Sequence, residues 1–191
     1  MIRLMLVGKK GVGKDTVAQI VRDVCGEPVV RRAFADMLKE DTRHIMEYVK
    51  RNFDVRGVSF DGDEREVMRP FWQWYGTDFV RRFDPDHWIR RFDQSFGHCV
   101  NIIVTDCRFH NEATYGKRNG FVLCRIVGPD WRGDTNAQTA RHLSETELED
   151  IGCHTTVRND GTIDDLRRTI VEDLLPFVRK RAFLRPSPMN K

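Results

Sequence analysis

The chain has 191 residues, which is enough for one well-packed domain and too few for two ordinary ones. Its 32 basic and 29 acidic residues leave a net charge of only +3, so we expect a mixed surface and no stable binding to nucleic acid. The five cysteines form an odd set without a C-x-x-C pair, which favours reduced thiols over a disulfide framework or a zinc site. Neither a signal peptide nor a membrane-length apolar run is found, so we expect a cytoplasmic protein without membrane contact.

The first predicted element is an apolar strand, Ile2–Val7, that leads directly into a glycine-rich loop with the spacing G-x-x-x-x-G-K. Glycines at this spacing can turn successive backbone N–H groups toward a polyphosphate, and the helix that follows, Lys14–Cys25, adds its positive dipole end. The order of strand, loop and helix favours a nucleotide site over a turn of purely structural use. The residues expected to hold the nucleotide phosphates are Gly8, Gly11, Val12, Gly13, Lys14, Asp15 and Thr16.

A second strand is predicted over Val29–Phe34, although its arginines dilute the apolar pattern, and a helix over Met37–Lys50. Asp36 and Lys39 follow this strand and should lie near the edge of the sheet where ligands bind. A helix cap explains Asp36 almost as well.

A long insertion, about residues 35–97, separates the second and third strands and holds three of the four tryptophans. A single crossover helix needs far fewer residues, so we expect a helical subdomain that binds a second substrate beside the nucleotide. Within it, Glu64–Phe83 is predicted to be helical, and Arg69 and Gln73 fall one turn apart on the same face. The many aromatic residues here suit a nucleobase pocket, but a core position or a homodimer interface explains each of them equally well.

The third strand, Val100–Thr105, is followed by Asp106 and Arg108. Residues at such strand ends line the ligand crevice of open α/β sheets. Asp106 is suited to hold Mg²⁺ or its water molecules, and Arg108 to bind a phosphate with its guanidinium fork. The alternative is a buried Asp–Arg pair that only closes the strand.

After a fourth strand, Phe121–Val127, the segment of about residues 128–143 is polar and resembles a mobile lid. Arg132 could close from this lid onto the transferred phosphoryl group, or it is simply a solvated loop charge. A fifth strand, His154–Val157, and a final helix, Ile163–Arg181, with Thr162 as its N-cap complete the pattern. Buried strands that alternate with helices predict an α/β fold, with a five-stranded parallel sheet covered by helices on both faces.

Taken together, these segments resemble the bacteriophage deoxynucleoside monophosphate kinases, a branch of the P-loop nucleoside monophosphate kinases. The resemblance covers most of the chain and depends on the order and spacing of six motifs: Gly8–Thr16; Phe34–Asp36 with Leu38–Lys39; Arg69 with Gln73 and Gly76–Thr77; Thr105–Glu112; His142–Glu145; and Arg158–Thr162. It implies a single-domain, three-layer P-loop NTPase fold over residues 1–191. It also implies transfer of the ATP γ-phosphate to a deoxynucleoside monophosphate with Mg²⁺, which supplies DNA precursors in a host cytoplasm if a phage encodes the chain.

The resemblance also implies roles for individual residues. The expected catalytic residues are Lys14, Asp106, Arg108 and Arg132, and the expected Mg²⁺ ligands, through water, are Asp15 and Asp106. Asn159 is expected near the donor adenine. The residues expected to bind the acceptor are Phe34, Asp36, Lys39, Arg69, Trp72, Gln73, Thr77, Arg81, Trp88 and Arg108.

Two positions depart from the family pattern. Asp15 stands where many P-loop proteins have the Ser or Thr that binds Mg²⁺, and Gly128 stands where an arginine is expected, so Arg125 or Arg132 is a candidate replacement. Two other functions fit part of the sequence: a kinase for a small metabolite, such as dephospho-coenzyme A, and a nucleotide-sensing or DNA-associated ATPase. The near-neutral charge argues against the last of these.

Overall fold

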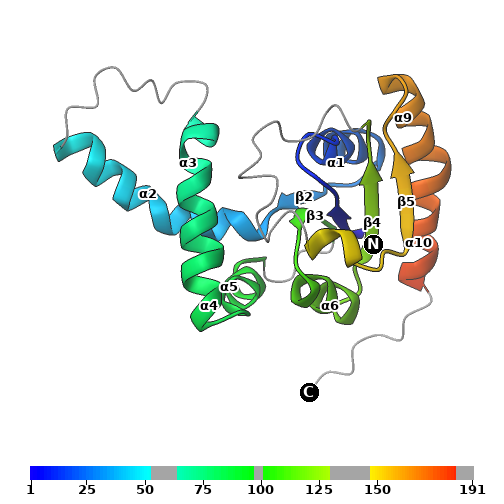
Figure 1. The fold of residues 1–191 in the computed structure, drawn as a ribbon. Coiled ribbons are helices and arrows are strands. Elements are labelled where there is room, and N and C mark those ends of the chain that lie inside the picture. Colours follow the sequence, from blue (N-terminus) through cyan, green and yellow to red (C-terminus); the bar gives the residue numbers. More distant parts are fainter. Residues whose placement is uncertain (53–63, 97–100, 130–146, 184–191) are drawn as a thin grey trace.

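The computed structural model describes residues 1–52, 64–96, 101–129 and 147–183 (Figure 1). Its centre is a five-stranded sheet in the order β2-β3-β1-β4-β5, in which all neighbours are parallel. The strands are β1 (Arg3–Val7), β2 (Val30–Arg32), β3 (Ile102–Cys107), β4 (Val122–Val127) and β5 (Thr155–Arg158). All five predicted strands are confirmed, and β3 extends two residues further than predicted, so that it includes Asp106.

Helices cover both faces of the sheet. Between the strands and after them lie α1 (Lys14–Val24), α2 (Phe34–Asn52), α3 (Glu64–Gln73), the π-helical segment η1 (Trp74–Val80), α4 (Arg81–Phe83), α5 (His87–Phe96), α6 (His110–Arg118), the 3₁₀ turn η3 (Glu147–Asp150), α9 (Ile163–Thr169), the π-helical segment η4 (Ile170–Leu174) and α10 (Leu175–Phe183). Two apolar layers result. One joins the sheet to α1, α9, η4 and α10, and the other joins it to α5, α6, η3 and the start of α2.

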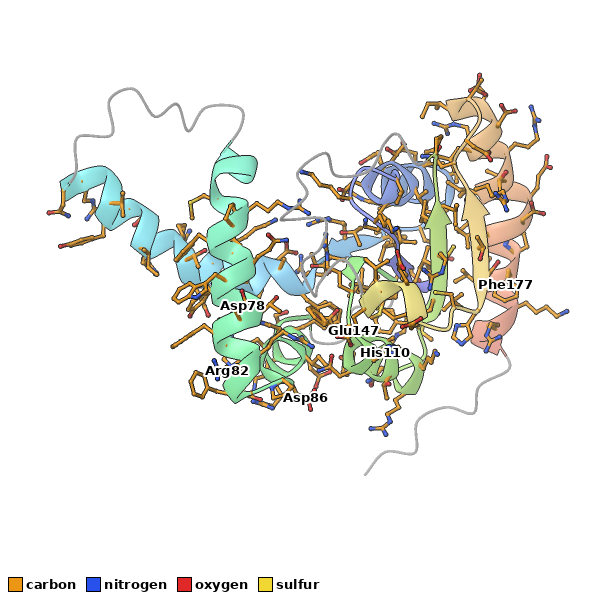
Figure 2. All side chains as sticks on the ribbon, in the orientation of Figure 1. Asp78, Arg82, Asp86, His110, Glu147 and Phe177 are labelled. Carbon is orange, nitrogen blue, oxygen red and sulfur yellow. The ribbon has the colours of Figure 1, made fainter. Side chains whose placement is uncertain are left out.

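Figure 2 shows examples from the two layers. Phe177, on α10, packs against the first layer. His110 and Glu147 lie next to each other at the surface beside the second layer. There the His110 backbone N–H donates to the Glu147 carboxylate at 2.9 Å and joins α6 to η3. Among the described helices, none is both long enough and apolar enough to cross a membrane.

Two helices, α5 and α6, were not predicted from the sequence. The segment that forms α6 reads HNEATYGKR, and only Ala113 and Tyr115 give it an apolar side against the core. Its first turn is stabilised instead by the Glu112 carboxylate, which accepts hydrogen bonds from the backbone N–H groups of Arg108 and Phe109. By contrast, the predicted N-cap of α9 is confirmed, because the Thr162 hydroxyl accepts from the Asp165 N–H at 3.1 Å.

Where the structure describes the insertion between β2 and β3, it is helical apart from a turn at residues 84–86, and α2 to α5 lie together on one side of the sheet (Figure 1). The predicted helix Glu64–Phe83 is one run, but its middle widens into the π-helical segment η1. Pro70 removes one backbone donor inside α3. Such π-helical turns are rare and often occur at functional sites. Here η1 begins directly after Gln73, a predicted substrate residue.

Candidate functional site: a phosphate loop facing a helical insertion

The glycine-rich loop between β1 and α1 is held by close backbone contacts. Gly13 is the N-cap of α1 and has φ +95°, a left-handed conformation that L-residues rarely adopt. A Cβ atom on Gly13 would also overlap the side-chain amide nitrogen of Asn159. That amide is buried and donates to the Val12 carbonyl at 2.9 Å, and the Asn159 backbone N–H donates to Val127 at 2.7 Å. Asn159 therefore braces the loop from the end of β5.

The Lys14 side chain folds back over the loop. Its ammonium group donates to the Gly8 carbonyl at 2.6 Å and to the Lys9 carbonyl at 2.7 Å. Burial, and after it the positive charge of Arg108, lower the pKa of Lys14 to about 7. A bound polyphosphate would raise this pKa again, because it places negative charge beside the ammonium group.

The Asp106 carboxylate, at the end of β3, caps the neighbouring helix α2. One oxygen accepts the Phe34 N–H and the other accepts the Ala35 N–H, both at 2.8 Å. Burial raises the pKa of Asp106, and the two backbone hydrogen bonds oppose that rise. The carboxylate thus joins β3 to the first turn of the insertion. It also lines the same cavity as the phosphate loop.

Arg31, the middle residue of β2, lies between two carboxylates. Its guanidinium is 3.2 Å from Asp36 and 3.6 Å from Asp15, the residue that follows Lys14 in the loop. Asp36 also accepts the Ala33 N–H at 2.8 Å, so both interpretations of Asp36 hold: it lines the cavity and it caps α2. Arg31 therefore connects the donor loop to the start of the insertion.

On the insertion side, Trp72 is fixed by its polar edge. Its indole N–H donates to the Thr42 hydroxyl at 2.9 Å, and the Lys39 ammonium lies 5.4 Å from the centre of its ring. One turn away from Arg69, the side-chain amide nitrogen of Gln73 is buried and has no hydrogen-bond partner among the described residues. A buried donor without a partner is costly, so this amide is suited to a group supplied by a ligand.

The π-helical segment brings two helices close together. Gly76 is buried, and a Cβ atom there would lie 2.9 Å from Leu38 of α2. The Gly76 carbonyl accepts the indole N–H of Trp88 at 3.0 Å, so α5 is fixed to the same turn. Trp88 is only 4% exposed and lines the cavity. The aromatic side chains that face outward from this region, Trp74, Phe79 and Phe83, are not part of the cavity wall.

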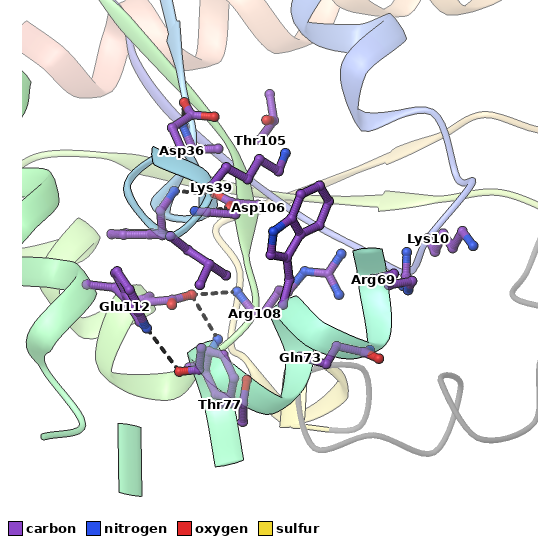
Figure 3. A pocket seen from close by; sticks show the side chains of 18 of the residues that line it. Lys10, Asp36, Lys39, Arg69, Gln73, Thr77, Thr105, Asp106, Arg108 and Glu112 are labelled. Atoms are coloured by element: carbon purple, nitrogen blue, oxygen red, sulfur yellow. Dashed lines mark hydrogen bonds between the residues drawn. The ribbon is translucent and has the colours of Figure 1, made fainter. Parts of the chain in front are cut away.

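These elements enclose one cavity of about 760 Å³, which Figure 3 shows from close by. Its volume is in the range of small-molecule sites. Seven basic residues line it: Lys10, Lys14, Arg31, Lys39, Arg69, Arg81 and Arg108. Four acidic residues line it: Asp15, Asp36, Asp106 and Glu112. A chain with a net charge of only +3 thus concentrates positive charge in this cavity, which suits a strongly anionic ligand.

A family model for deoxynucleotide monophosphate kinases matches residues 26–170 of the chain. The chain belongs to the deoxynucleotide monophosphate kinase family. The matched range begins after α1 and does not include the phosphate loop. The loop is therefore a separate observation that also points to a nucleotide-binding protein. This agrees with the resemblance found in the sequence, and it makes the protein a nucleotide kinase.

A relative in Acanthamoeba polyphaga mimivirus, named "Putative deoxynucleotide monophosphate kinase", is 26% identical over 196 residues, which cover 90% of this chain and 95% of the relative. Two solved structures resemble the kinase in fold. A gluconokinase from Sinorhizobium meliloti 1021 has a TM-score of 0.50 at 15% identity, and the match covers 97% of this chain and 98% of that one. TT1252 from Thermus thermophilus has a TM-score of 0.51 at 19% identity, with 92% and 97% covered.

The cavity brings together most of the residues predicted for the site. Those that line it are Gly11, Lys14, Asp15, Phe34, Asp36, Lys39, Arg69, Trp72, Gln73, Thr77, Arg81, Trp88, Asp106 and Arg108. The cavity lining does not include the predicted residues Gly8, Val12, Gly13, Thr16 and Asn159, of which Asn159 braces the loop at Val12 and Gly13. Arg132 and the motif His142–Glu145 lie outside the described residues, as does most of the expected lid, 128–143.

Three charged lining residues were not predicted as site residues: Lys10, Arg31 and Glu112. Arg31 lies inside β2, where the arginines only weaken the apolar pattern, so nothing in that pattern marks it as a ligand residue. Arg125 was a candidate for the arginine expected where Gly128 stands. Its guanidinium instead donates to the carbonyls of Leu148, Glu149 and Ile151 and so holds the turn η3 against β4.

Proposed function

We propose that this kinase transfers the γ-phosphate of ATP to a deoxynucleoside 5′-monophosphate and releases ADP and the deoxynucleoside diphosphate. The observation that carries the proposal is the basic cavity that reaches from the phosphate loop to the insertion. One wall offers a loop and a helix N-terminus for a triphosphate. The other offers arginines and the buried Gln73 amide, which no described residue satisfies. A cavity that held ATP alone would not need the second wall.

On the donor side, the loop amides and Lys14 bind the phosphates of ATP. On the acceptor side, Arg69 and Arg108 bind the monophosphate, and Trp72 and Gln73 contact the base. Phosphoryl transfer needs little covalent help from a protein, because the barrier falls when the two anions are aligned, neutralised and shielded from water. The cluster of lining cations supplies that neutralisation.

The residues present also fit a Mg²⁺ ion. Within the described part of the chain, no group of three or more His, Cys, Asp or Glu side chains forms a protein-only metal site. Mg²⁺ in kinases is usually held by one or two carboxylates together with phosphate oxygens and water, and Asp15 and Asp106 of the cavity can supply these. Both Asp106 oxygens already accept a backbone N–H, so each keeps a second lone pair for a metal-bound water. When bound, the ion would neutralise charge on the transferred phosphate.

A coupled assay of ADP release tests the proposal. The kinase is mixed with ATP, Mg²⁺ and, one at a time, the four common deoxynucleoside monophosphates and hydroxymethyl-dCMP. We expect turnover that depends on at least one of them. Dephospho-coenzyme A and double-stranded DNA serve as the other additions. Turnover that responds only to one of these, and to no monophosphate, would refute the proposal.

A further inference from the structure

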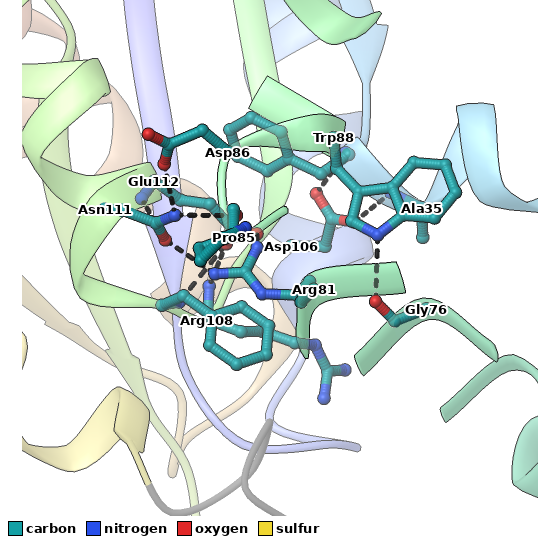
Figure 4. A network of polar contacts seen from close by, with 12 residues as sticks. Ala35, Gly76, Arg81, Pro85, Asp86, Trp88, Asp106, Arg108, Asn111 and Glu112 are labelled. Carbon is teal, nitrogen blue, oxygen red and sulfur yellow. Dashed lines mark hydrogen bonds and ion pairs between the residues drawn. The ribbon is translucent and has the colours of Figure 1, made fainter. Parts of the chain in front are cut away.

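Glu112 is the acidic cavity residue to which the proposed chemistry gives no role. Its side chain is only 3% exposed and accepts three hydrogen bonds (Figure 4). Oε1 accepts from the Arg81 guanidinium at 3.2 Å, and Oε2 accepts the backbone N–H groups of Arg108 at 2.8 Å and Phe109 at 3.2 Å. A single carboxylate thus joins the end of the insertion to the turn that carries Arg108.

Arg81 is held firmly in this network. Its second Nη atom donates to the Asn111 side chain at 2.7 Å, and its guanidinium lies 3.7 Å from the centre of the Phe109 ring. Asn111 in turn donates to the Pro85 carbonyl at 2.9 Å and to the Asp86 carboxylate at 2.7 Å. Both ends of the Arg81 fork are therefore occupied by protein groups. The side chain supports the cavity wall, and its fork is not aimed at an acceptor phosphate.

An ionised carboxylate is expensive at this depth. Burial raises the pKa of Glu112 to about 7, although the Arg81 charge and the two backbone N–H groups act in the opposite direction. A buried apolar residue would stabilise the fold at lower cost. The carboxylate instead fixes a conformation, because two of its three hydrogen bonds hold the backbone N–H groups of Arg108 and Phe109 in place.

We propose that Glu112 is a positioning residue for the acceptor: by clamping Arg81 and the Arg108–Phe109 turn, it orients Arg108 toward the monophosphate. The proposal depends on the proposed function, in which Arg108 binds the acceptor phosphate. It assigns Asn111 a weaker role of the same kind, through Arg81. Both residues act through Arg81 and the Arg108–Phe109 turn and not through the phosphate loop, so binding of ATP to that loop should be independent of both.

Steady-state kinetics at pH 8 of wild type, Glu112→Gln and Asn111→Ala test this role. We expect Glu112→Gln to lower kcat/KM for the preferred monophosphate by about 10-fold to 100-fold, the range of a lost charge-assisted hydrogen bond, while the Kd for ATP stays within twofold. Asn111→Ala, a partly exposed site, should fold normally and give a smaller loss in the same direction. In a double-mutant cycle with Arg108→Ala, the two losses should not add, because Glu112 acts through Arg108.

Tyr115→Phe is the matched control. The Tyr115 hydroxyl donates to Asp93 at 2.5 Å and ties α6 to α5 without contact to the Arg108 turn. The control should leave the kinetic constants unchanged. Wild-type kinetics in both soluble test variants, or an equal effect of the control, would overturn the inference. Absence of any monophosphate turnover by the wild type is a different result and would count against the proposed function itself.

Discussion

Substitution of Gly13 by alanine, compared with the same change at Gly26, tests whether the Asn159 amide stabilises the phosphate loop. Both glycines have positive φ, +95° and +75°. An alanine in this left-handed region costs about 1–2 kcal/mol wherever it occurs. The surroundings differ: nothing lies within 4 Å of a Cβ atom on Gly26, whereas one on Gly13 overlaps the Asn159 amide.

The difference between the two sites can be estimated from that contact. To make room, the Asn159 amide must leave the Val12 carbonyl that it reaches at 2.9 Å, and both groups are buried. Buried polar groups left without partners cost about 1–3 kcal/mol. We therefore expect Gly13→Ala to lower the free energy of unfolding by about 2–5 kcal/mol in total, and Gly26→Ala by about 1–2 kcal/mol.

Urea denaturation and ATP binding provide the assay. Gly13→Ala should weaken ATP binding at least tenfold, because the loop amides and Lys14 move with Asn159. Gly26→Ala should bind ATP as the wild type does. In a domain of this size, each kcal/mol corresponds to about 2–4 °C in Tm, so thermal melts resolve the difference as well. Equal destabilisation by the two substitutions, with ATP binding intact in both, would refute this account of the loop.

Three further predictions concern the charged groups of the cavity. With a pKa of about 7, only about a tenth of the Lys14 side chains carry the proton at pH 8 when the site is free, so ATP binding should take up close to one proton. Calorimetry in two buffers of different ionisation enthalpy measures this uptake. The variant Lys14→Arg should take up none. Arg108→Ala should reduce kcat/KM for the monophosphate by about 10-fold to 150-fold with the Kd for ATP unchanged, and unchanged kinetics would return Arg108 to a structural role. Between pH 4.5 and 7 the folded protein keeps the Glu112 proton that the unfolded chain has lost, so stability should fall as pH rises through this window, by about 3 kcal/mol at most. Denaturation curves of Glu112→Gln should lack that component, and an identical pH dependence in the variant would contradict the assignment.

The central sheet and the phosphate loop of this kinase could be predicted from the sequence. Strands β1, β3 and β4 are short apolar runs, and the weaker β2 and β5 follow the same alternation with helices, so the five-stranded sheet could be predicted. The spacing of Gly8–Lys14 predicted the phosphate loop. Helix α6 was missed because its stability comes from the Glu112 carboxylate and from contacts with distant elements, and almost none of it from an apolar stripe.

Pairings between distant side chains could not be predicted. Asp106 and Arg108 were predicted as ligand groups or as a pair with each other, but Asp106 caps α2, more than seventy positions away in the chain. Arg81 was expected to bind substrate, and the structure instead occupies its guanidinium with Asn111 and Glu112. Such pairings depend on how the insertion lies against the sheet, which local pattern does not encode.

The central claim is that one cavity holds a triphosphate donor and a monophosphate acceptor at the same time. Calorimetric titration of the preferred deoxynucleoside monophosphate into the kinase, first alone and then saturated with a non-hydrolysable ATP analogue and Mg²⁺, measures this directly. We expect one acceptor to bind per chain in both titrations. Loss of acceptor binding when the analogue is present would show that the two compete for one place, and would contradict the claim.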